Sequence, residues 1–411
     1  MRSVAKPAAF ERACPDNDSI LLMEANPMRR PDYDGASLVN LMTSIAGAFG
    51  ASLPYAPLAV PLAGLERART VILLVIDGLG DHWLAEHAPN GALRAHRRGA
   101  IDSVFPTTTA TAITTFLTGL APAQHALTGW FMHLREIGAV TAILPLTVRA
   151  GGQSIAIQGL PPAGLFAHAP LAARLPIASF VVSPKKIADS PFNVFHSGPA
   201  TRVRYGTIEE MVDALARIAR SGHGRQYVYA YYPEVDACAH DHGMASARTR
   251  AEVERADGAF GALLQALRGT DTIVVVTADH GFVDSPPARQ IELDRHPALA
   301  DTLVLPLCGE PRVAYAYVHP ERTGAFERAV QGVLEGRGQA RRSVDLIASG
   351  AFGPGRPHPR LADRIGHYAI VMAADWTLRD RVLGEHRHPQ IGAHGGTSDW
   401  EMRVPLVVAS G

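Results

Sequence analysis

Runs of apolar, mostly β-branched residues recur along the chain and mark its expected strands. Four of these runs have strand length, at residues 71–76, 227–232, 272–277 and 404–408. Continuous apolar runs of this kind are typical of strands covered on both faces in a parallel sheet. Segments with a helical spacing of apolar residues lie before or between them, at 37–49, 111–117, 207–219 and 248–267. The alternation predicts an α/β fold with a central, mostly parallel sheet flanked by helices.

Two stretches do not follow this alternation. Residues 140–205 are rich in Gly, Pro and Ala and contain only short apolar runs. Residues 285–390 have a strand–helix–strand pattern of their own, and core-like sequence resumes at Ala393. We therefore expect three parts, which are an extension packed on the core (1–65), a main domain (66–284 with 391–411) and an inserted, smaller α+β cap (285–390).

The composition excludes some classes of binding partner but does not identify one. The 411 residues include 39 Lys and Arg and 39 Asp and Glu, so the formal net charge is zero. Without an excess of positive charge, we expect no binding to nucleic-acid polymers or to anionic membranes. The three Cys have no CxxC spacing, which disfavours a disulfide framework. No apolar run approaches a membrane span or a signal sequence, so we expect a cytoplasmic protein, whose oligomeric state stays open.

Acidic and histidine residues follow the expected strands. Because the carboxyl ends of parallel strands meet at one edge of a sheet, we expect these side chains to gather there. Each residue taken singly has a simpler explanation, such as an Asp that caps the next helix. Together they provide enough ligands for two divalent ions, and the mixture of carboxylates and imidazoles favours Zn²⁺, or Mn²⁺, over Ca²⁺ and Mg²⁺. The candidates are Asp77, Asp236, His240, Asp279, His280 and His394.

A threonine triplet, Thr107–Thr109, stands between Pro106 and an expected helix. A hydroxyl at a helix N-terminus lies close to free backbone N–H groups, which stabilise an anion. A neighbouring metal ion would also lower the pKa of that hydroxyl and make it a nucleophile at neutral pH. On this segment alone, helix capping is the simpler explanation of the triplet.

The ordered set of motifs resembles the alkaline phosphatase superfamily, and within it the type I phosphodiesterase/nucleotide pyrophosphatase family. The set comprises Asp77-Gly78, FPTTT with TGLAPAQH (Phe105–His125), VDACAH (Asp236 to His240), ADHG (Asp279 to Gly281) and HGG with EMRVPL (His394 to Leu406). The resemblance spans roughly residues 71–135, 225–284 and 391–409. It implies an alkaline-phosphatase-like catalytic domain with an inserted cap.

The resemblance also implies the roles of the site residues. Thr109 would be the nucleophile, because it stands three residues after Pro106 and nine before Thr118; Thr108 is the nearest alternative. One divalent ion would be held by Asp77, Thr109, Asp279 and His280, and the other by Asp236, His240 and His394. The implied activity is hydrolysis of phosphodiester or pyrophosphate bonds in a small phosphate ester or nucleotide-like substrate, through a phosphothreonine intermediate.

Two departures from the family pattern affect the substrate side of the site. The family has Thr-Phe-Pro-Asn-His at the nucleophile, whereas this chain has Ala110 directly after Thr109. A family Asn that hydrogen-bonds the phosphoryl oxygen is replaced by Trp130. We expect Trp130 and Phe131 either to line the substrate pocket or to pack against the sheet. His242 is expected either to contact substrate, to support a ligand or to be exposed.

Other functions stay open at this point. A phosphomonoesterase, phosphonate hydrolase or phosphomutase would use the same residues. A sulfatase is disfavoured because no CxPxR-type motif lies near Thr109. A non-catalytic nucleotide-binding module is suggested by the run Asp77–Gly80 after a strand, but the third Gly of a dinucleotide fingerprint is missing. Two further residues near the motifs are given structural roles, His125 as a bridge to backbone at a helix end and Cys238 as a small buried residue.

Overall fold

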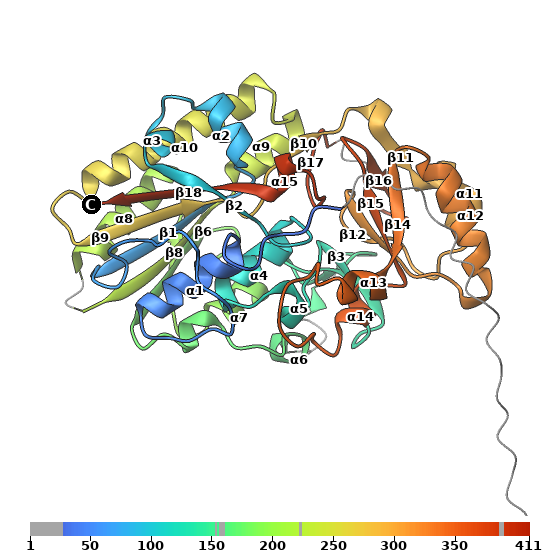
Figure 1. Ribbon diagram of the computed structural model, residues 1–411, viewed down its shortest axis with the longest axis horizontal. Coiled ribbons are helices and arrows are strands. Elements are labelled where there is room, and N and C mark those ends of the chain that lie inside the picture. The colour runs from blue at the N-terminus through green and yellow to red at the C-terminus, as the bar shows by residue number, and fades with distance from the viewer. Residues whose placement is uncertain (1–27, 153, 156–160, 222–223, 386–389) are drawn as a thin grey trace, which may run out of the picture.

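The computed structural model describes residues 28–152, 154–155, 161–221, 224–385 and 390–411. Most of its strands form two seven-stranded sheets that lie side by side. The larger sheet, on the left in Figure 1, has the longer strands, and the smaller sheet has the shorter ones. Residues 1–27 of the expected extension lie outside the described part. No helix in the described residues is long and apolar enough to cross a membrane.

The larger sheet has seven strands in the order β2-β18-β9-β1-β8-β6-β7. Pairing is parallel from β9 through β1, β8 and β6 to β7, and β18 runs antiparallel to both β9 and β2. The mostly parallel sheet predicted from the sequence is therefore confirmed. The strands are β1 (Thr70–Ile76), β2 (Arg97–Asp102), β6 (Ala178–Pro184), β7 (Thr201–Tyr205), β8 (Gln226–Tyr232), β9 (Thr272–Thr277) and β18 (Arg403–Ser410).

The stretch 140–205 contributes more to the sheet than its composition indicated. Both β6 and β7 come from it, and β2 also lies outside the four expected strands. In β7 only the last of the five residues is buried, so the strand lacks the continuous apolar run that marks the central strands. By contrast, all seven residues of β1 and of β8 are buried.

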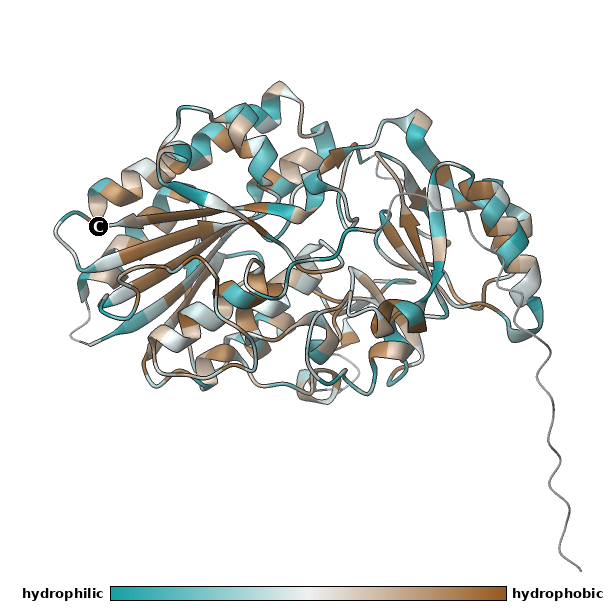
Figure 2. Cartoon of the chain, viewed as in Figure 1, coloured by the Kyte–Doolittle hydropathy of each residue, from teal (hydrophilic) through white to brown (hydrophobic). Residues whose placement is uncertain are grey.

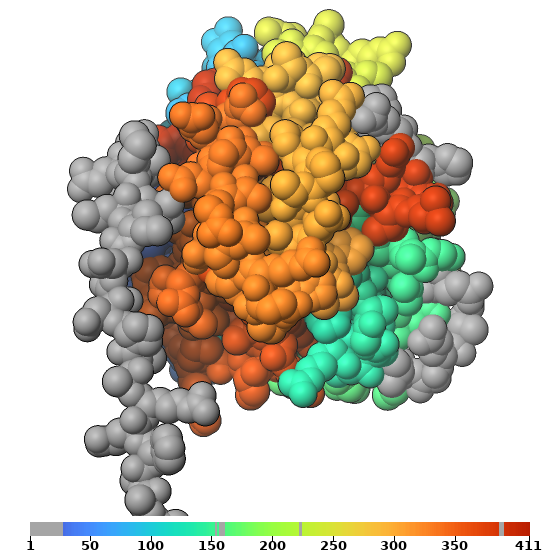
Figure 3. Space-filling view, turned by 90° about the vertical axis from the view of Figure 1, so that its right-hand side faces the viewer, coloured from blue at the N-terminus to red at the C-terminus, as the bar shows by residue number. Residues whose placement is uncertain are grey.

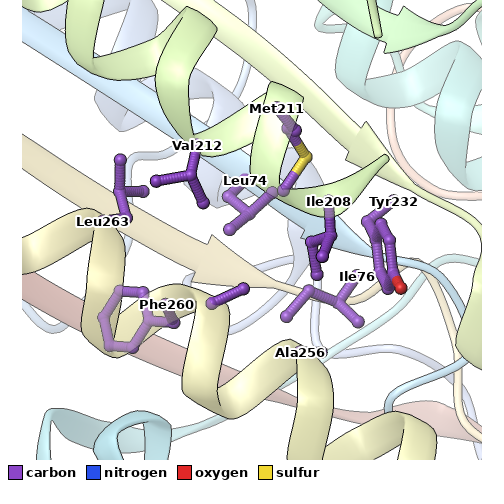
Figure 4. A pocket seen from close by; sticks show the side chains of 10 residues that line it. Leu74, Ile76, Ile208, Met211, Val212, Tyr232, Ala256, Phe260 and Leu263 are labelled. Atoms are coloured by element: carbon purple, nitrogen blue, oxygen red, sulfur yellow. The ribbon is translucent and has the colours of Figure 1, made fainter. Parts of the chain in front are cut away.

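Helices cover both faces of the larger sheet. On one face α8 (Ile208–Ser221) packs with α10 (Ala247–Ala266), and on the other α1 (Leu38–Ala48) packs with α4 (Thr109–Thr118). Figure 4 shows apolar side chains of α8 and α10 meeting Leu74 and Ile76 of β1 in a small pocket. Because its lining is apolar apart from the Tyr232 hydroxyl, this pocket belongs to the core. Figure 2 shows the same division, with hydrophobic strands inside and hydrophilic positions on the outer helices.

The remaining helices are short. They are α2 (Asp81–His87), α3 (Ala92–Ala95), α5 (Pro122–His125), α6 (Pro162–Leu165), α7 (Pro191–Ser197), α9 (Glu234–His242), α11 (Pro297–Ala300), α13 (Ser343–Ala348), α14 (Leu361–Arg364) and α15 (Asp399–Met402). Single 3-10 turns span Leu171–Ala173, Pro287–Arg289, Leu293–Arg295 and Pro320–Arg322. Helix α9 follows β8 directly, and this places it at the carboxyl edge of the larger sheet.

The smaller sheet combines two distant parts of the chain. Its order is β14-β15-β13-β12-β3-β4-β5, and its pairs are antiparallel. Figure 3 shows this end of the molecule, where residues of the 285–390 segment lie beside those near 130–150. Helix α12 (Thr323–Leu334) packs on β14. The strands are β3 (Phe131–Leu134), β4 (Ala139–Ala142), β5 (Thr147–Val148), β12 (Cys308–Gly309), β13 (Val313–Ala316), β14 (Gly338–Arg342) and β15 (Tyr368–Met372).

Two short pairs of strands lie at the ends of the expected cap and within it. Strand β10 (Val283–Asp284) pairs with β17 (Gly392–Ala393), so the two ends of the 285–390 segment lie together. Within the segment, β11 (Gln290–Glu292) pairs in parallel with β16 (Thr377–Arg379). Because β3, β4 and β5 lie outside residues 285–390, the smaller sheet is not made by that segment alone, and the three-part division stays a prediction.

Candidate active site

The three threonine hydroxyls at the start of α4 point to three different partners. Thr107 donates to the Gly396 carbonyl at 2.8 Å, and Thr108 donates to Oε1 of Glu310 at 2.5 Å. The Oγ1 of Thr109, the first residue of α4, lies 3.1 Å from Nε2 of His280. Thr108 is the N-cap residue, yet its side chain makes no capping hydrogen bond. Only the Thr109 hydroxyl therefore faces one of the predicted metal ligands.

The carboxyl ends of three parallel strands, β1, β8 and β9, bring five of the six predicted ligands to one place. Asp77 follows β1 directly, and Asp279 with His280 follow the neighbouring strand β9. Asp236 and His240 lie one turn apart on α9, so they share a face of that helix. His394 follows β17. All six predicted ligands are brought together, along with Thr109.

His280 is the centre of the first group. Its Nε2 lies 3.4 Å from Oδ1 of Asp77, 3.4 Å from Oδ2 of Asp279 and 3.9 Å from Oδ1 of Asp236. These short separations place one imidazole among three carboxylates. Asp77, Asp279 and His280 form one group whose ligand atoms lie within 4.8 Å of one another.

His394 and His240 complete the cluster. The Nε2 atoms of His240 and His394 are 3.2 Å apart, and they lie 3.4 Å and 3.8 Å from Oδ1 of Asp236. The rings of His280 and His394 stack with centroids 3.7 Å apart. A second metal-sized group therefore consists of Asp236, His280 and His394. It shares His280 with the first group, whereas the family resemblance assigns His280 to one ion and His240 to the other.

The carboxylates present unpaired oxygens to the centre of the cluster. Oδ1 of Asp77, Oδ1 of Asp236 and Oδ2 of Asp279 are buried and have no hydrogen-bond partner in the described part of the chain. The other oxygen of Asp77 accepts from the Tyr231 hydroxyl, and that of Asp279 accepts from the N–H groups of Gly78 and His280, both at 3.0 Å. Buried, unpaired carboxylate oxygens are unfavourable unless a cation satisfies them. The donor set thus fits divalent ions.

Each histidine is oriented by a backbone carbonyl. Nδ1 of His240 lies 3.0 Å from the Gly392 oxygen, and Nδ1 of His280 lies 3.1 Å from the Gly281 oxygen. Nδ1 of His394 lies 3.3 Å from the carbonyl oxygen of Thr107. If each Nδ1–H donates to its carbonyl, the Nε2 lone pair is left facing the cluster, which is the arrangement of a metal-ligating histidine.

Burial sets the protonation states in the cluster. It lowers the pKa of His280 and His394, in the latter case together with the neighbouring histidines, and it lowers the pKa of His240 to about 4. Burial, reinforced by neighbouring carboxylates, raises the pKa of Asp77 and Asp236. The histidines are therefore neutral at pH 7, and the like-charged carboxylates need a cation nearby in order to remain ionised.

The predicted substrate contacts lie in different surroundings. Trp130 has 38% of its surface exposed, and its backbone N–H donates to Oε1 of Glu310 at 2.7 Å. Phe131 lies in β3, with the Arg149 guanidinium 4.3 Å above its ring. His242 pairs through Nε2 with Arg248 at 3.1 Å, and no described contact joins it to the metal-ligand cluster. Their roles toward a substrate stay predictions.

His125 and Cys238 were given structural roles from the sequence. His125 accepts the Leu127 N–H on Nδ1 and lies 3.2 Å from the Thr115 hydroxyl through Nε2, so it bridges the end of α5 as predicted. Cys238 is half-buried, and its sulfur accepts from the Thr249 hydroxyl at 3.6 Å.

Glu310 is a site residue that the sequence did not reveal. It is buried, and it contacts both Thr108 and Trp130 although it lies between β12 and β13, about two hundred positions from the threonine triplet. In the sequence it stands in the run LCGEPRV, where nothing relates it to the other motifs. Burial raises its pKa to about 7, and the hydrogen bonds from Thr108 and Trp130 act in the opposite direction.

The fold, together with the cluster of acids and histidines at the carboxyl edge of its sheet, is that of a hydrolase with an α/β fold and side chains that could hold divalent metal ions. The model of the type I phosphodiesterase/nucleotide pyrophosphatase family matches residues 71–397, well over half of the chain. The chain belongs to this family and is a hydrolase of the phosphodiesterase/nucleotide pyrophosphatase type. No curated protein sequence gives a significant match.

Solved structures show the same fold. The murine ectonucleotide pyrophosphatase/phosphodiesterase 5 is 18% identical, with a TM-score of 0.63, over 82% of this chain and 87% of that one. An inactive variant of the murine protein, solved in complex with AMP, gives the same values. The human protein is 17% identical, with a TM-score of 0.61 and the same coverage. The family predicted from the ordered motifs is confirmed by the family model, and the solved structures show that the fold is shared.

Proposed function

We propose that this protein cleaves phosphodiester or pyrophosphate bonds with Thr109 as the nucleophile and two divalent ions as cofactors. The observation that carries the proposal is the convergence of three unpaired carboxylate oxygens and three neutral imidazoles beside the Thr109 hydroxyl. The family and its relatives support the type of bond that is cleaved. The nucleophile and the number of ions rest on the site geometry and on the motif positions.

Two sets of side chains would hold the ions. Asp77, Asp279 and His280, with Thr109, would hold one of them. The other would lie among Asp236, His240 and His394. Carboxylate oxygens and imidazole nitrogens suit Zn²⁺, with Mn²⁺ as the alternative. When bound, such ions polarise phosphoryl oxygens and lower the pKa of a neighbouring hydroxyl.

Thr109 performs the bond exchange in the proposed mechanism. Its Oγ1 attacks phosphorus and loses its proton to solvent, while the bond from phosphorus to the leaving oxygen breaks and the electron pair departs with that oxygen. A water molecule then attacks the phosphothreonine, and the electron pair of the Oγ1–P bond returns to Thr109, which regains a proton. Each turnover consumes one water and regenerates the hydroxyl.

The start of α4 supports the same step. The first N–H groups of a helix have no intrahelical acceptor, and the helix dipole adds positive potential there. Helix α4 has ten residues and begins at Thr109, so the N–H groups of its first residues would lie close to a phosphoryl group bonded to that side chain. The helix terminus would stabilise the charge that develops on the phosphoryl oxygens.

We propose a small phosphate ester or nucleotide as the substrate. The AMP bound to the inactive murine relative supports a nucleotide. Exposed Trp130, which is tied to Thr108 through Glu310, would line the pocket for the leaving or retained group. Two divalent ions carry about four positive charges against three aspartates, so the pocket would attract an anion although the whole chain has no net charge.

The proposal is tested by reconstituting metal-free protein with Zn²⁺ or Mn²⁺. Bis(4-nitrophenyl) phosphate, 4-nitrophenyl phosphate and the 4-nitrophenyl ester of a nucleoside 5′-monophosphate are then compared as substrates. We expect metal-dependent hydrolysis of both diesters, with a higher kcat/KM than for the monoester. A strong preference for the monoester would favour the phosphomonoesterase alternative, and hydrolysis that is insensitive to chelator would refute the metal-dependent mechanism.

A further inference from the structure

Glu310 is held against the threonine triplet by tertiary packing. It lies in the turn between β12 and β13, where its own N–H donates to the Val313 carbonyl at 2.9 Å. Its Oε1 accepts from the Thr108 hydroxyl at 2.5 Å and from the Trp130 backbone N–H at 2.7 Å. One carboxylate oxygen therefore fixes the residue before Thr109 and the start of β3 at the same time.

Two glycines allow this close approach. A Cβ at Gly395, the residue after His394, would lie 2.7 Å from the Cβ of Glu310. A Cβ at Gly129 would lie 2.7 Å from the Cα of Gly309. Both contacts are shorter than real Cβ atoms allow, so a side chain at position 395 would displace Glu310 and one at position 129 would displace the backbone of Gly309, the residue before Glu310. The carboxylate consequently lies between the threonine triplet and the loop that carries His394.

The second oxygen of Glu310 is not committed to a protein partner. In the described part of the chain Oε2 makes no hydrogen bond, and no ion pair involves this residue. The nearest cation in the sequence, Arg312, is engaged with Glu401 through two hydrogen bonds of 2.9 and 2.8 Å. The charge of Glu310 reaches the metal-ligand cluster, since it contributes to the raised pKa of Asp236.

We propose that Glu310 is a specificity-determining residue that disfavours phosphate monoesters relative to diesters. The inference rests on the proposed function, in which the phosphoryl group is bonded to Thr109, next to the residue that Glu310 contacts. A monoester dianion carries one more negative charge at that position than a diester monoanion. In a poorly hydrated site, a nearby carboxylate repels the additional charge, and a discrimination of about tenfold to a hundredfold is expected.

Glu310→Gln is the test variant, because it removes the charge and keeps an oxygen that accepts from Thr108 and Trp130. The quantity measured is the ratio of kcat/KM for 4-nitrophenyl phosphate to that for methyl 4-nitrophenyl phosphate, at pH 8.5 with metal-loaded enzyme. We expect the variant to raise this ratio about tenfold or more. Inhibition by inorganic phosphate should also become tighter, by a similar factor. An unchanged ratio would overturn the inference, as would an equal loss of both activities.

Glu310→Asp is the matched control, since it keeps the charge and shortens the side chain that accepts from Thr108 and the Trp130 backbone N–H. Its ratio should equal that of the wild type; a shift as large as in Glu310→Gln would mean that packing rather than charge sets the preference. If Glu310→Gln does not fold, Glu310→Ala also removes the charge and is judged by the same ratio. Wild-type protein that hydrolyses neither ester with either metal would refute the proposed function, which is a different result from an unchanged ratio.

Discussion

The hydroxyl of Thr109 lies 3.1 Å from Nε2 of His280, although the two residues are 171 positions apart in the sequence. Thr109 is placed by the start of α4, and His280 by the end of β9. The two elements are far apart in the chain, so no local sequence pattern sets their relative position. The separation is fixed by the packing of α4 against the sheet and by the parallel pairing of β9 with β1.

Replacing Thr109 should separate its chemical role from its structural one. We expect Thr109→Ala to lower kcat for a diester by at least about a thousandfold, because no hydroxyl remains to attack phosphorus. Thr109→Ser should keep measurable turnover, since it retains a hydroxyl on the same carbon. Steady-state hydrolysis of bis(4-nitrophenyl) phosphate checks both expectations.

Mass spectrometry of acid-quenched enzyme gives a second readout for Thr109. After mixing with bis(4-nitrophenyl) phosphate, wild-type protein should carry a substrate-derived phosphoryl adduct on the peptide that contains Thr109. Thr109→Ala should carry none. Thr107→Ser is the control, because its hydroxyl can still donate to Gly396. An adduct on Thr108 or Thr107 would contradict the assignment, and full activity of Thr109→Ala would exclude it as the nucleophile.

Asp77→Asn should change stability in opposite directions with and without metal. Burial, Asp236 and Asp279 raise the pKa of Asp77 above its unfolded value, so the folded protein binds more protons there and loses stability as the pH rises above about 4. In metal-free protein at pH 8, neutral Asn should therefore stabilise the fold by about 1–2 kcal/mol. The Tyr231 hydroxyl can still donate to the Asn oxygen.

With metal bound, the wild type should instead be more stable than Asp77→Asn. Bound ions stabilise the wild type by mass action, and the variant has lost one carboxylate ligand, so its gain in Tm on adding Zn²⁺ should be smaller. Urea unfolding with and without chelator, together with the metal content of the purified protein, measures both effects. A destabilised metal-free Asp77→Asn would show that the carboxylate is satisfied by the protein alone.

The site residues that could be predicted are those tied to local pattern. Asp77 and Asp279 follow continuous apolar strands, and Asp236 and His240 share a helix face one turn apart, so spacing and strand ends located them. Their gathering at one edge follows from parallel pairing alone. The allocation of His240 and His280 to individual ions depends on distances that no sequence pattern contains.

The strands and the site residue that were not predicted depend on tertiary packing. Strand β7 lies at the edge of the larger sheet with four of its five residues at least partly accessible, so it lacks an apolar run. Strands β3 to β5 join β12 to β15 across more than 150 positions, a pairing with no local signal. Glu310 reaches Thr108 only because this smaller sheet forms, which explains why its position near the nucleophile could not be foreseen.

Acidification should destabilise the protein through a histidine pair far from the metal ligands in sequence. Nδ1 of His196 donates to the Phe192 carbonyl at 2.9 Å, so its Nε2 is free to accept from Nε2–H of His168, also at 2.9 Å. Burial lowers the pKa of His196 to about 4, and burial with the neighbouring His196 lowers the pKa of His168 to about 3. Both are neutral in the folded protein at pH 6.

The unfolded chain therefore binds more protons than the folded one below a pH of about 6.5, the ordinary histidine value. Stability from this pair is complete above that pH and declines as the pH falls toward the folded pKa values, by about 1.4 kcal/mol per pH unit for each histidine. The double variant His168→Phe with His196→Phe should make the decline in stability between pH 7.5 and 5 less steep, because the buried histidines of the metal-ligand cluster still contribute to it. His319→Gln, at an exposed position, is the control and should leave it unchanged. An equally steep decline in the double variant would contradict the assignment.

The buried pair of Arg312 and Glu401 should couple the smaller sheet to the threonine triplet. The two side chains are almost fully buried and share hydrogen bonds of 2.9 and 2.8 Å. Burial alone would raise the pKa of Glu401, but the charge and hydrogen bonds of Arg312 outweigh it and leave that pKa lowered. Glu401 also accepts the Gly396 N–H at 2.8 Å, and the Gly396 carbonyl accepts the Thr107 hydroxyl.

Removing one partner should cost more than removing both. Arg312→Met leaves a buried, unpaired carboxylate, and we expect a loss of about 3–5 kcal/mol in the free energy of unfolding. Adding Glu401→Leu should restore most of that stability, because no charge is then left in the core. Activity should be low in both variants. In the double variant the Gly396 N–H loses its acceptor, Glu401, so Gly396 no longer holds the Thr107 hydroxyl in place. Urea unfolding and kcat/KM for a diester, measured on both variants, separate the two effects. A double variant that regains wild-type activity would show that the pair stabilises the fold without positioning Thr109.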